Sequence, residues 1–277
     1  MVAAVEIEPH AFATYKTNHP EVQAYKQDVR TVKGQSLLAL SPNGGIDLLS
    51  GCPPCQGFSS LTAKYKRSDP RNELVLEMGR LVEEIQPKIL MMENVSGLPK
   101  KGVQFFQALL QKLDMLGYIT EWDILQVADY GVPQSRQRLV LLAGKGFPIH
   151  LPKSTHSKMG EYGLRKWRNV RDVIGDMPEP IPLSEANSSG GPQRYNWHIV
   201  RSISSDTLKI LKAARPGESR IKLPDELRPP CHKNREDGFN NVYGRLSWEQ
   251  VAPTITGECT TFSKGRFGHP EKVFEKF

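Results

Sequence analysis

The feature that most constrains this chain is a short apolar run that ends in a turn rich in glycine and proline. Ile46-Asp47-Leu48-Leu49 has the composition of a buried strand, and Ser50-Gly51-Cys52-Pro53-Pro54-Cys55 follows it directly. Each proline fixes its own backbone angle and has no N–H to donate, so the chain must leave the sheet in a stiff loop. Because α/β folds gather their chemistry at such strand ends, we predict that Cys55 lies at a reactive site.

Three other interpretations fit this loop when it is considered alone. It could be a tight turn that carries a buried thiol, or a redox pair, because Cys52 and Cys55 have C-x-x-C spacing. It could also be half of a zinc site, for which Cys231-His232 is the only other close Cys/His pair. A redox motif should open a helix at its first cysteine, which Pro53-Pro54 and Gly57 disfavour. Adjacent residues rarely ligate one ion together, so we predict no metal site.

Polar side chains follow other predicted strands. The apolar strand predicted within residues 2–8 carries Glu6 near its carboxyl end. The strand predicted over residues 87–92 is followed by Glu93. Arg136 and Arg138 precede a buried strand over residues 139–143, and their i, i+2 spacing predicts that they share one face of it. We expect the strand ends that carry Cys55 and Glu93 to be adjacent and to point into one crevice.

Charge and periodicity divide the chain. The net charge is +7, and residues 145–236 hold 17 Lys/Arg against 10 Asp/Glu, whereas the flanking segments are each neutral. Residues 151–244 lack the strand–helix alternation of the first half, apart from one predicted helix over 202–214. We therefore predict an α/β domain over residues 1–145, a smaller irregular basic domain over 146–244 and a return segment over 245–277. The basic excess favours binding to a polyanion.

Composition also predicts the compartment. Four cysteines in 277 residues, without a signal peptide, indicate thiols in a reducing compartment. The chain contains no apolar run of the roughly 20 residues needed to span a bilayer, so we expect a soluble, cytoplasmic protein that does not bind a membrane.

Several segments, taken in order, resemble one family. Pro54-Cys55-Gln56-Gly57-Phe58-Ser59 is similar to the nucleophile loop of DNA (cytosine-5)-methyltransferases, and Glu93-Asn94-Val95 resembles that family's E-N-V motif. The segment 134–138 resembles its Q-x-R-x-R motif, and residues 243–256 resemble the motif that anchors its recognition region. The resemblance covers nearly the whole chain. It implies a doubly wound, mostly parallel Rossmann-like sheet, which is the fold of S-adenosylmethionine-dependent methyltransferases, with a target-recognition domain over 146–244.

The resemblance also implies roles for single residues. Cys55 would attack carbon 6 of a flipped cytosine, Glu93 would act as the acid at nitrogen 3, and Arg138 would hold the cytosine carbonyl. Arg136, like Arg138, is a candidate for activating the thiol. S-adenosylmethionine is the implied cofactor, with Glu6 on its ribose. The implied cofactor contacts are Glu6, Ile7, Asp28, Val29, Pro54 and Leu74. The implied DNA contacts are Gln56, Ser59, Arg245 and Thr254.

The resemblance implies double-stranded DNA as the partner and a bacterial restriction-modification system, hence a cytoplasmic, nucleoid-associated protein. Two segments of the family pattern are not found: the first strand with its F-x-G-x-G turn, expected before Val2, and a final G-N motif. An alternative hypothesis is therefore a truncated, inactive DNA-binding remnant or a split subunit that needs a complementary chain. Without such a chain we expect a monomer.

Overall fold

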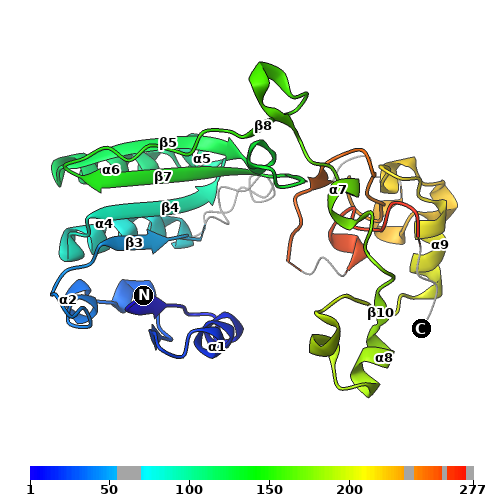
Figure 1. Ribbon diagram of the computed structural model, residues 1–277, viewed down its shortest axis with the longest axis horizontal. Coiled ribbons are helices and arrows are strands. Elements are labelled where there is room, and N and C mark those ends of the chain that lie inside the picture. The colour runs from blue at the N-terminus through cyan, green and yellow to red at the C-terminus, as the bar shows by residue number, and fades with distance from the viewer. Residues whose placement is uncertain (55–69, 234–239, 258–260, 273–277) are drawn as a thin grey trace. The chain divides into compact units, whose positions relative to one another are not determined.

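The computed structural model describes residues 1–54, 70–233, 240–257 and 261–272 (Figure 1). The chain forms two compact units, which are described separately. The first comprises Met1–Leu125 and Gln137–Lys153, and the second comprises Gln126–Arg136 and Ser154–Phe277. These bounds differ from the predicted domains 1–145, 146–244 and 245–277, whose functional assignments remain predictions.

The first unit alternates strands and helices, as its sequence predicts. Its elements are β1 (Ala3–Val5), α1 (Pro9–Asn18), β2 (Gln23–Tyr25), the 3-10 turn Val29–Thr31, α2 (Gly34–Leu38), β3 (Leu48–Gly51), the 3-10 turn Pro70–Glu73, α4 (Leu74–Ile85), β4 (Ile89–Val95), α5 (Leu98–Lys101), α6 (Val103–Met115), β5 (Tyr118–Gln126) and β7 (Gln137–Lys145).

The main sheet has four strands in the order β3-β4-β7-β5. Strands β3 and β4 are parallel, whereas β4 and β7 are antiparallel. Strands β1 and β2 form a separate parallel pair. The sheets are therefore mixed, and the prediction of one mostly parallel, doubly wound sheet is wrong in this respect. The physical reason lies in residues 127–136, which form a 3-10 turn and a two-residue strand between β5 and β7 instead of the crossover helix that parallel pairing requires.

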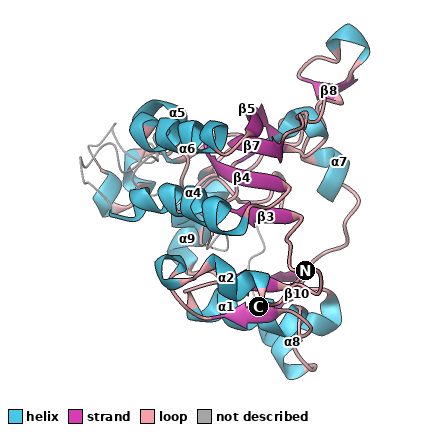
Figure 2. Ribbon diagram, turned by 90° about the vertical axis from the view of Figure 1, so that its left-hand side faces the viewer, coloured by secondary structure: helices cyan, strands magenta, loops and turns pink. Residues whose placement is uncertain are grey.

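Helices α4 and α6 lie on one face of the four-stranded sheet (Figure 2). Along β4, Leu90, Met92 and Asn94 are buried, while the alternate residues are half-buried or exposed. This period-2 pattern puts Glu93 on the face opposite the helices. A slip of one residue would exchange the two faces, so burial of the apolar set fixes the register.

The core of the first unit lies between the sheet and these two helices. Apolar side chains repeat at helical spacing along α4 and α6, as the sequence predicts. The fully buried members include Val75, Val82, Leu90, Met92, Leu109, Leu113, Leu139 and Leu141.

A second cluster joins an adjacent face of α4 to the N-terminal segment. Val32 and Leu37 are buried there against Leu81 and Ile85, and β1 and β2 contribute partly buried side chains. The segment that precedes β3 is thus packed on the same helix as the main core.

The second unit is irregular, with short elements and a small core around Ile210, Ala214 and Leu223. The predicted helix over 202–214 is present as α9. The elements of the second unit are the 3-10 turn Val127–Tyr130, β6 (Gln134–Ser135), β8 (His156–Ser157), the turn Glu161–Gly163, β9 (Arg165–Lys166), α7 (Arg171–Ile174), β10 (Ile181–Pro182), α8 (Leu183–Ser188), the turn Pro192–Tyr195, β11 (Ile199–Val200), α9 (Ser205–Ala213), the turns Arg220–Lys222, Asp225–Leu227 and Pro230–His232, β12 (Ala252–Pro253) and the turn Phe262–Lys264.

The fold predicts a large difference between two leucines on the helices of the first unit. Leu109 of α6 is 1% exposed, whereas Leu76 of α4 is 39% exposed. Leu109→Ala should lower the free energy of unfolding by about 2–5 kcal/mol, because it removes buried methyl groups and leaves a cavity. Leu76→Ala should cost less than about 1 kcal/mol. Urea unfolding of both variants measures the difference, and equal losses would contradict the assignment of α6 to the core.

Candidate active site

The turn that follows β3 is tied to the end of β4. The strand ends at Gly51, where a Cβ atom would lie 2.5 Å from the Met78 sulfur, so a larger residue here would require the Met78 side chain to shift. The Nδ2 group of Asn94 donates a hydrogen bond of 3.1 Å to the Pro53 carbonyl, and its Oδ1 accepts one of 2.9 Å from the Val95 N–H. Asn94 is 1% exposed, so this amide is a buried, paired anchor for the turn.

The cysteine that this turn leads to lies outside the described residues. Pro54 is described and exposed. The predicted nucleophile Cys55 and the predicted DNA contacts Gln56 and Ser59 all fall within residues 55–69. Their roles remain predictions. Cys52, the other member of the C-x-x-C pair, is exposed.

Glu93 and Arg138 form an ion pair at the carboxyl end of β4. Arg138 Nε lies 2.7 Å from Glu93 Oε1, and the glutamate side chain is 36% exposed. In the antiparallel register Val95 lies opposite Arg138 and Glu93 lies opposite Val140, so Glu93 and Arg138 are diagonal neighbours on one face. A second donor of Arg138, Nη1, bonds the Gln137 carbonyl at 2.8 Å. A partly exposed carboxyl is thus held in a fixed orientation and can still accept or donate a proton.

Arg136 does not continue the strand that carries Arg138. It lies between β6 and β7, and its N–H and carbonyl bond Gln126 Oε1 and the Val127 N–H, both at 2.9 Å. The prediction that both arginines share one face of a single strand is therefore wrong, because the chain folds back on residues 126–127 at this point. Arg136 belongs to the second unit, and its predicted role remains a prediction.

The first two predicted cofactor contacts lie where β1 ends. Val5 is paired with Tyr25 of the parallel strand β2, and the Glu6 N–H bonds the Tyr25 carbonyl at 3.0 Å. One oxygen of the Glu6 carboxylate accepts the Glu8 N–H at 2.8 Å. Ile7 is 60% exposed, so an apolar side chain is accessible to solvent just after β1.

Asp28 is held by its neighbour two residues on. Arg30 donates to both carboxylate oxygens through Nε and Nη2, and the Arg30 N–H bonds Asp28 Oδ1 at 2.9 Å. The hydrogen bonds from the Arg30 side chain have the largest effect, followed by the one from the Arg30 N–H. Together they lower the pKa of Asp28 from 3.8 to about 2. The carboxylate therefore remains charged at neutral pH and acts only as a hydrogen-bond acceptor.

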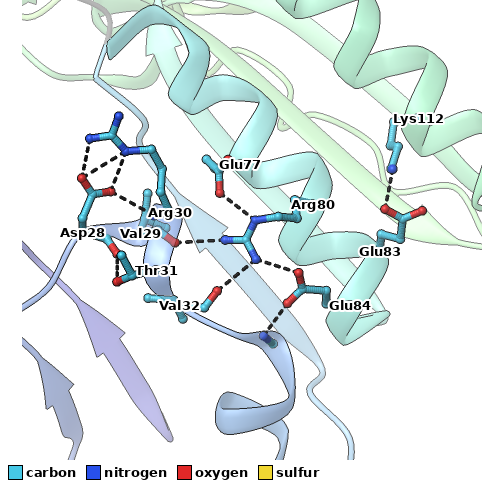
Figure 3. A network of polar contacts seen from close by, with 11 residues as sticks. Asp28, Val29, Arg30, Thr31, Val32, Glu77, Arg80, Glu83, Glu84 and Lys112 are labelled. Atoms are coloured by element: carbon cyan, nitrogen blue, oxygen red, sulfur yellow. Dashed lines mark hydrogen bonds and ion pairs between the residues drawn. The ribbon is translucent and has the colours of Figure 1, made fainter. Parts of the chain in front are cut away.

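Arg80 fastens the segment that carries Asp28 and Val29 to α4 (Figure 3). Its guanidinium donates to the carbonyls of Val29 at 3.0 Å and Val32 at 2.9 Å. It also pairs with Glu77 and Glu84 of its own helix, each at 2.7 Å. Although burial alone would lower the pKa of Arg80, the two carboxylates raise it.

The same helix completes this attachment at the far end of the segment. Glu84 Oε2 accepts the Gly34 N–H at 2.6 Å, and this hydrogen bond is the main reason that the pKa of Glu84 is lowered. Leu74, another predicted cofactor contact, is the half-buried first residue of α4. One helix therefore carries Leu74 and fixes the position of Asp28 and Val29.

Thr254 and Arg245, two of the predicted DNA contacts, take part in bonds within the second unit. β12 pairs with β6, and the Thr254 hydroxyl donates to the Ser135 carbonyl at 2.8 Å. Thr254 is half-buried. The segment 252–254 is therefore bonded directly to the segment that leads to Arg136.

Arg245 is 9% exposed and is bonded on every side. Its guanidinium donates to the carbonyls of Ala214 at 3.3 Å, His269 at 3.0 Å and Pro270 at 2.8 Å. Burial lowers its pKa. Three of its five N–H donors are thus used on the main chain, and the predicted DNA contact of Arg245 remains a prediction. We assign it to the internal support of the second unit.

Sequence reasoning missed two residues that position this site. Asn94 belongs to the E-N-V tripeptide, but only the strand alternation, which turns it to the buried face, indicates that it has an anchoring role. Arg80 had a visible signal, since Glu77 and Glu84 lie at i−3 and i+4 on the same helix. Its bonds to Val29 and Val32 span about 50 residues of sequence and follow no local pattern.

Two negative findings apply to the described part of the chain. Residues 1–54, 70–233, 240–257 and 261–272 contain no helix long and apolar enough to cross a membrane. Within these same ranges, no three His, Cys, Asp or Glu side chains are grouped so that they could hold a metal ion.

Comparison with a solved structure defines the class of fold. The chain is similar to the crystal structure of a protein described as a DNA modification methyltransferase encoded within an E. coli prophage, with a TM-score of 0.64. The match covers 92% of this chain and 75% of that chain at 20% identity. The chain therefore has the fold of DNA methyltransferases, built here with mixed sheets.

Sequence comparison places the chain in one family. The family model for C-5 cytosine-specific DNA methylases matches residues 1–264, so the chain belongs to that family of DNA (cytosine-5)-methyltransferases. It is 35% identical over 276 residues to the type II methylase M.HgiDII of Herpetosiphon aurantiacus, and this match covers 98% of the chain. It is 34% identical over 260 residues to the type II methyltransferase M1.HphI of Haemophilus parahaemolyticus. The chain spans 73% of the length of the first relative and 64% of the second.

The Asp28–Arg30 pair predicts a pH dependence of stability. A carboxyl group whose pKa is lower in the folded than in the unfolded chain stabilises the fold above its unfolded pKa, near 4, and loses that contribution as pH falls toward 2. Wild type should therefore be more stable than Arg30→Gln at pH 5, and the difference should shrink between pH 4 and pH 2. Urea unfolding at each pH measures it. A difference that stays constant down to pH 2 would contradict the lowered pKa.

Proposed function

We propose that this protein transfers a methyl group from S-adenosylmethionine to carbon 5 of a cytosine in duplex DNA. The observation that carries the proposal is the Glu93–Arg138 pair at the end of β4, next to the turn that Asn94 holds and that leads to Cys55. Membership of the cytosine-5 methylase family supports the same reaction.

The residues at the ends of β1 and β2 fit the adenosine part of this cofactor. The Glu6 and Asp28 carboxylates accept hydrogen bonds, which suits ribose hydroxyls and an adenine amino group, and the exposed Ile7 suits the ring face. Val29, Pro54 and Leu74 would complete the site. When bound, S-adenosylmethionine supplies the methyl group that carbon 5 accepts.

The chain's own residues account for the activation of the base. The Cys55 thiolate forms a bond to carbon 6, and the electron pair of the 5,6 double bond moves toward nitrogen 3. Glu93, as the neutral acid, donates its proton to nitrogen 3. Arg138 stabilises the carboxylate that remains and holds the cytosine carbonyl through the N–H donors of its guanidinium. Carbon 5 is then electron-rich and can accept the methyl group. A base then takes up the carbon 5 proton, the bond between sulfur and carbon 6 breaks, and nitrogen 3 returns its proton to the Glu93 carboxylate.

The substrate must be taken out of the duplex before this chemistry can occur, since carbon 6 of a stacked base is not accessible to a protein nucleophile. Gln56 and Ser59 would stabilise the opened duplex. The basic second unit, which contains most of the predicted recognition domain 146–244, would bind phosphates and read the major groove. The relatives' description as type II methylases supports a restriction-modification system in a bacterial cytoplasm.

Trapping of a covalent adduct tests this function. In 5-fluorocytosine, fluorine replaces the carbon 5 proton and cannot be removed by a base. After methyl transfer from labelled S-adenosylmethionine to duplex DNA that contains this base, the Cys55 adduct should therefore accumulate. The adduct should be absent in Cys55→Ser and should persist in Cys52→Ser, the matched control from the same turn. Gel electrophoresis under denaturing conditions detects it.

The outcomes separate the remaining hypotheses. DNA binding without an adduct in wild type would favour an inactive remnant or a split subunit. Recovery of the adduct on addition of a complementary chain of the same family would identify a split enzyme. Equal loss of function in both cysteine variants, with reversible disulfide formation, would favour the redox interpretation and overturn the proposal.

A further inference from the structure

A short basic arm projects from the second unit. It consists of residues 157–166, between β8 and β9, and it stands out beyond its neighbours in that unit (Figure 1). β8 and β9 pair in parallel, with His156 opposite Arg165. Strands of two residues cannot hold such an arm alone, so its orientation depends on how its base is fixed.

The base of the arm is bonded to the 3-10 turn Val127–Tyr130. Trp167 Nε1 donates to Asp129 Oδ1 at 2.8 Å, and the Thr155 N–H donates to the Asp129 carbonyl at 2.9 Å. His156 is buried, and a Cβ atom at Gly131 would lie 2.9 Å from its ring. The two ends of the arm are therefore fixed to the chain that continues into Arg136.

The turn at the tip is closed by its own side chains. The Ser157 hydroxyl donates to Glu161 Oε2 at 2.6 Å, and the Glu161 N–H donates back to the Ser157 Oγ at 2.8 Å. Glu161 Oε2 also accepts the Met159 N–H at 3.2 Å. The only acidic side chain of the arm, Glu161, is thus bonded within the turn, and it is exposed to solvent.

The tip presents a large ring to solvent. Tyr162 is 98% exposed, and Met159 beside it is 67% exposed. Tyr162 has φ +56° and ψ +32°, a left-handed backbone conformation that residues other than glycine seldom adopt. Glycine would adopt this backbone without a steric cost, so tyrosine places an amphipathic ring here at the expense of local stability.

Basic side chains flank this ring on both sides. Lys158, Arg165 and Lys166 are exposed, and no ion pair among the described residues involves any of them. Successive residues of a strand point to opposite faces, so Arg165 and Lys166 project from opposite sides of the arm. Other arginines of this unit are used internally, such as Arg171 on Glu249 and Arg228 on Asp225.

We propose that this arm enters a groove of duplex DNA, with Tyr162 packed in the groove and Lys158, Arg165 and Lys166 on the phosphates that border it. A groove has phosphates along both edges, which matches basic groups on both faces of a narrow ribbon with an amphipathic tip. The inference rests on the proposed DNA substrate. Because the base of the arm is bonded to the chain that leads to Arg136, docking of the arm would also locate that arginine relative to the duplex.

Variants of the full chain test the ring and the charges separately. Tyr162→Gly should keep or raise the melting temperature and weaken duplex DNA binding by about 5-fold or more, near the lower end of the loss seen when an aromatic ring is removed from a base of single-stranded DNA. Tyr162→Phe should bind within about threefold of wild type. The triple variant Lys158→Gln, Arg165→Gln, Lys166→Gln should lower the slope of log K against log salt by about 2–3, or roughly 0.9 for each phosphate that is no longer neutralised. Fluorescence anisotropy over a salt series measures both quantities.

A matched triple variant, Lys209→Gln, Lys212→Gln, Lys222→Gln, removes the same net charge from α9 and the turn after it. It should change the slope by less than half as much as the arm variant does. Equal effects of the two triple variants, or unchanged affinity in Tyr162→Gly, would overturn the inference while wild type still binds DNA. Wild type that binds no duplex DNA would overturn the proposed function and this inference with it.

Discussion

The antiparallel pairing of β4 with β7 is the interaction on which the candidate site depends. Its register puts Val95 opposite Arg138, so Arg138 reaches Glu93 along the diagonal of the same face. The register is fixed in turn by burial of Leu90 and Met92 against α4 and α6 on the other face. The packing of the core thereby determines that a carboxyl and a guanidinium, both partly exposed, meet at the carboxyl end of β4.

Two buried polar anchors extend this arrangement to the neighbouring segments. Asn94 uses the buried face of β4 to hold the Pro53 carbonyl, which fixes the turn that follows β3. Arg80 binds two carbonyls of the segment that follows β2, and it is itself held by two glutamates. Neither residue needs to touch a substrate, but each one limits how far a predicted catalytic or cofactor-binding segment can move relative to the core.

Local patterns predicted much of this structure. The periodicity of residues 74–85 and 103–113 gave two core helices, and the apolar run before Glu93 gave β4, because both signals arise from burial of one face. The direction of β7 could not be read in this way, since strand direction depends on which strands pair and on how the chain connects them. Arg245 shows the opposite limit: the family resemblance implied a DNA contact, yet only the folded chain reveals that three main-chain carbonyls accept hydrogen bonds from it. The second unit has little periodicity, so its short elements follow from individual bonds and not from a repeating pattern.

Exchange of tritium from carbon 5 of cytosine in duplex DNA tests the Glu93–Arg138 pair most directly. This exchange requires addition of the Cys55 thiolate and proton donation to the ring, and it needs no S-adenosylmethionine, so it isolates the base-activating step. We predict that wild type releases tritium to water and that Glu93→Gln slows the release by about 10²-fold or more, while binding DNA as tightly as wild type. Release by Glu93→Gln at the wild-type rate would contradict the assignment of Glu93 as the proton donor.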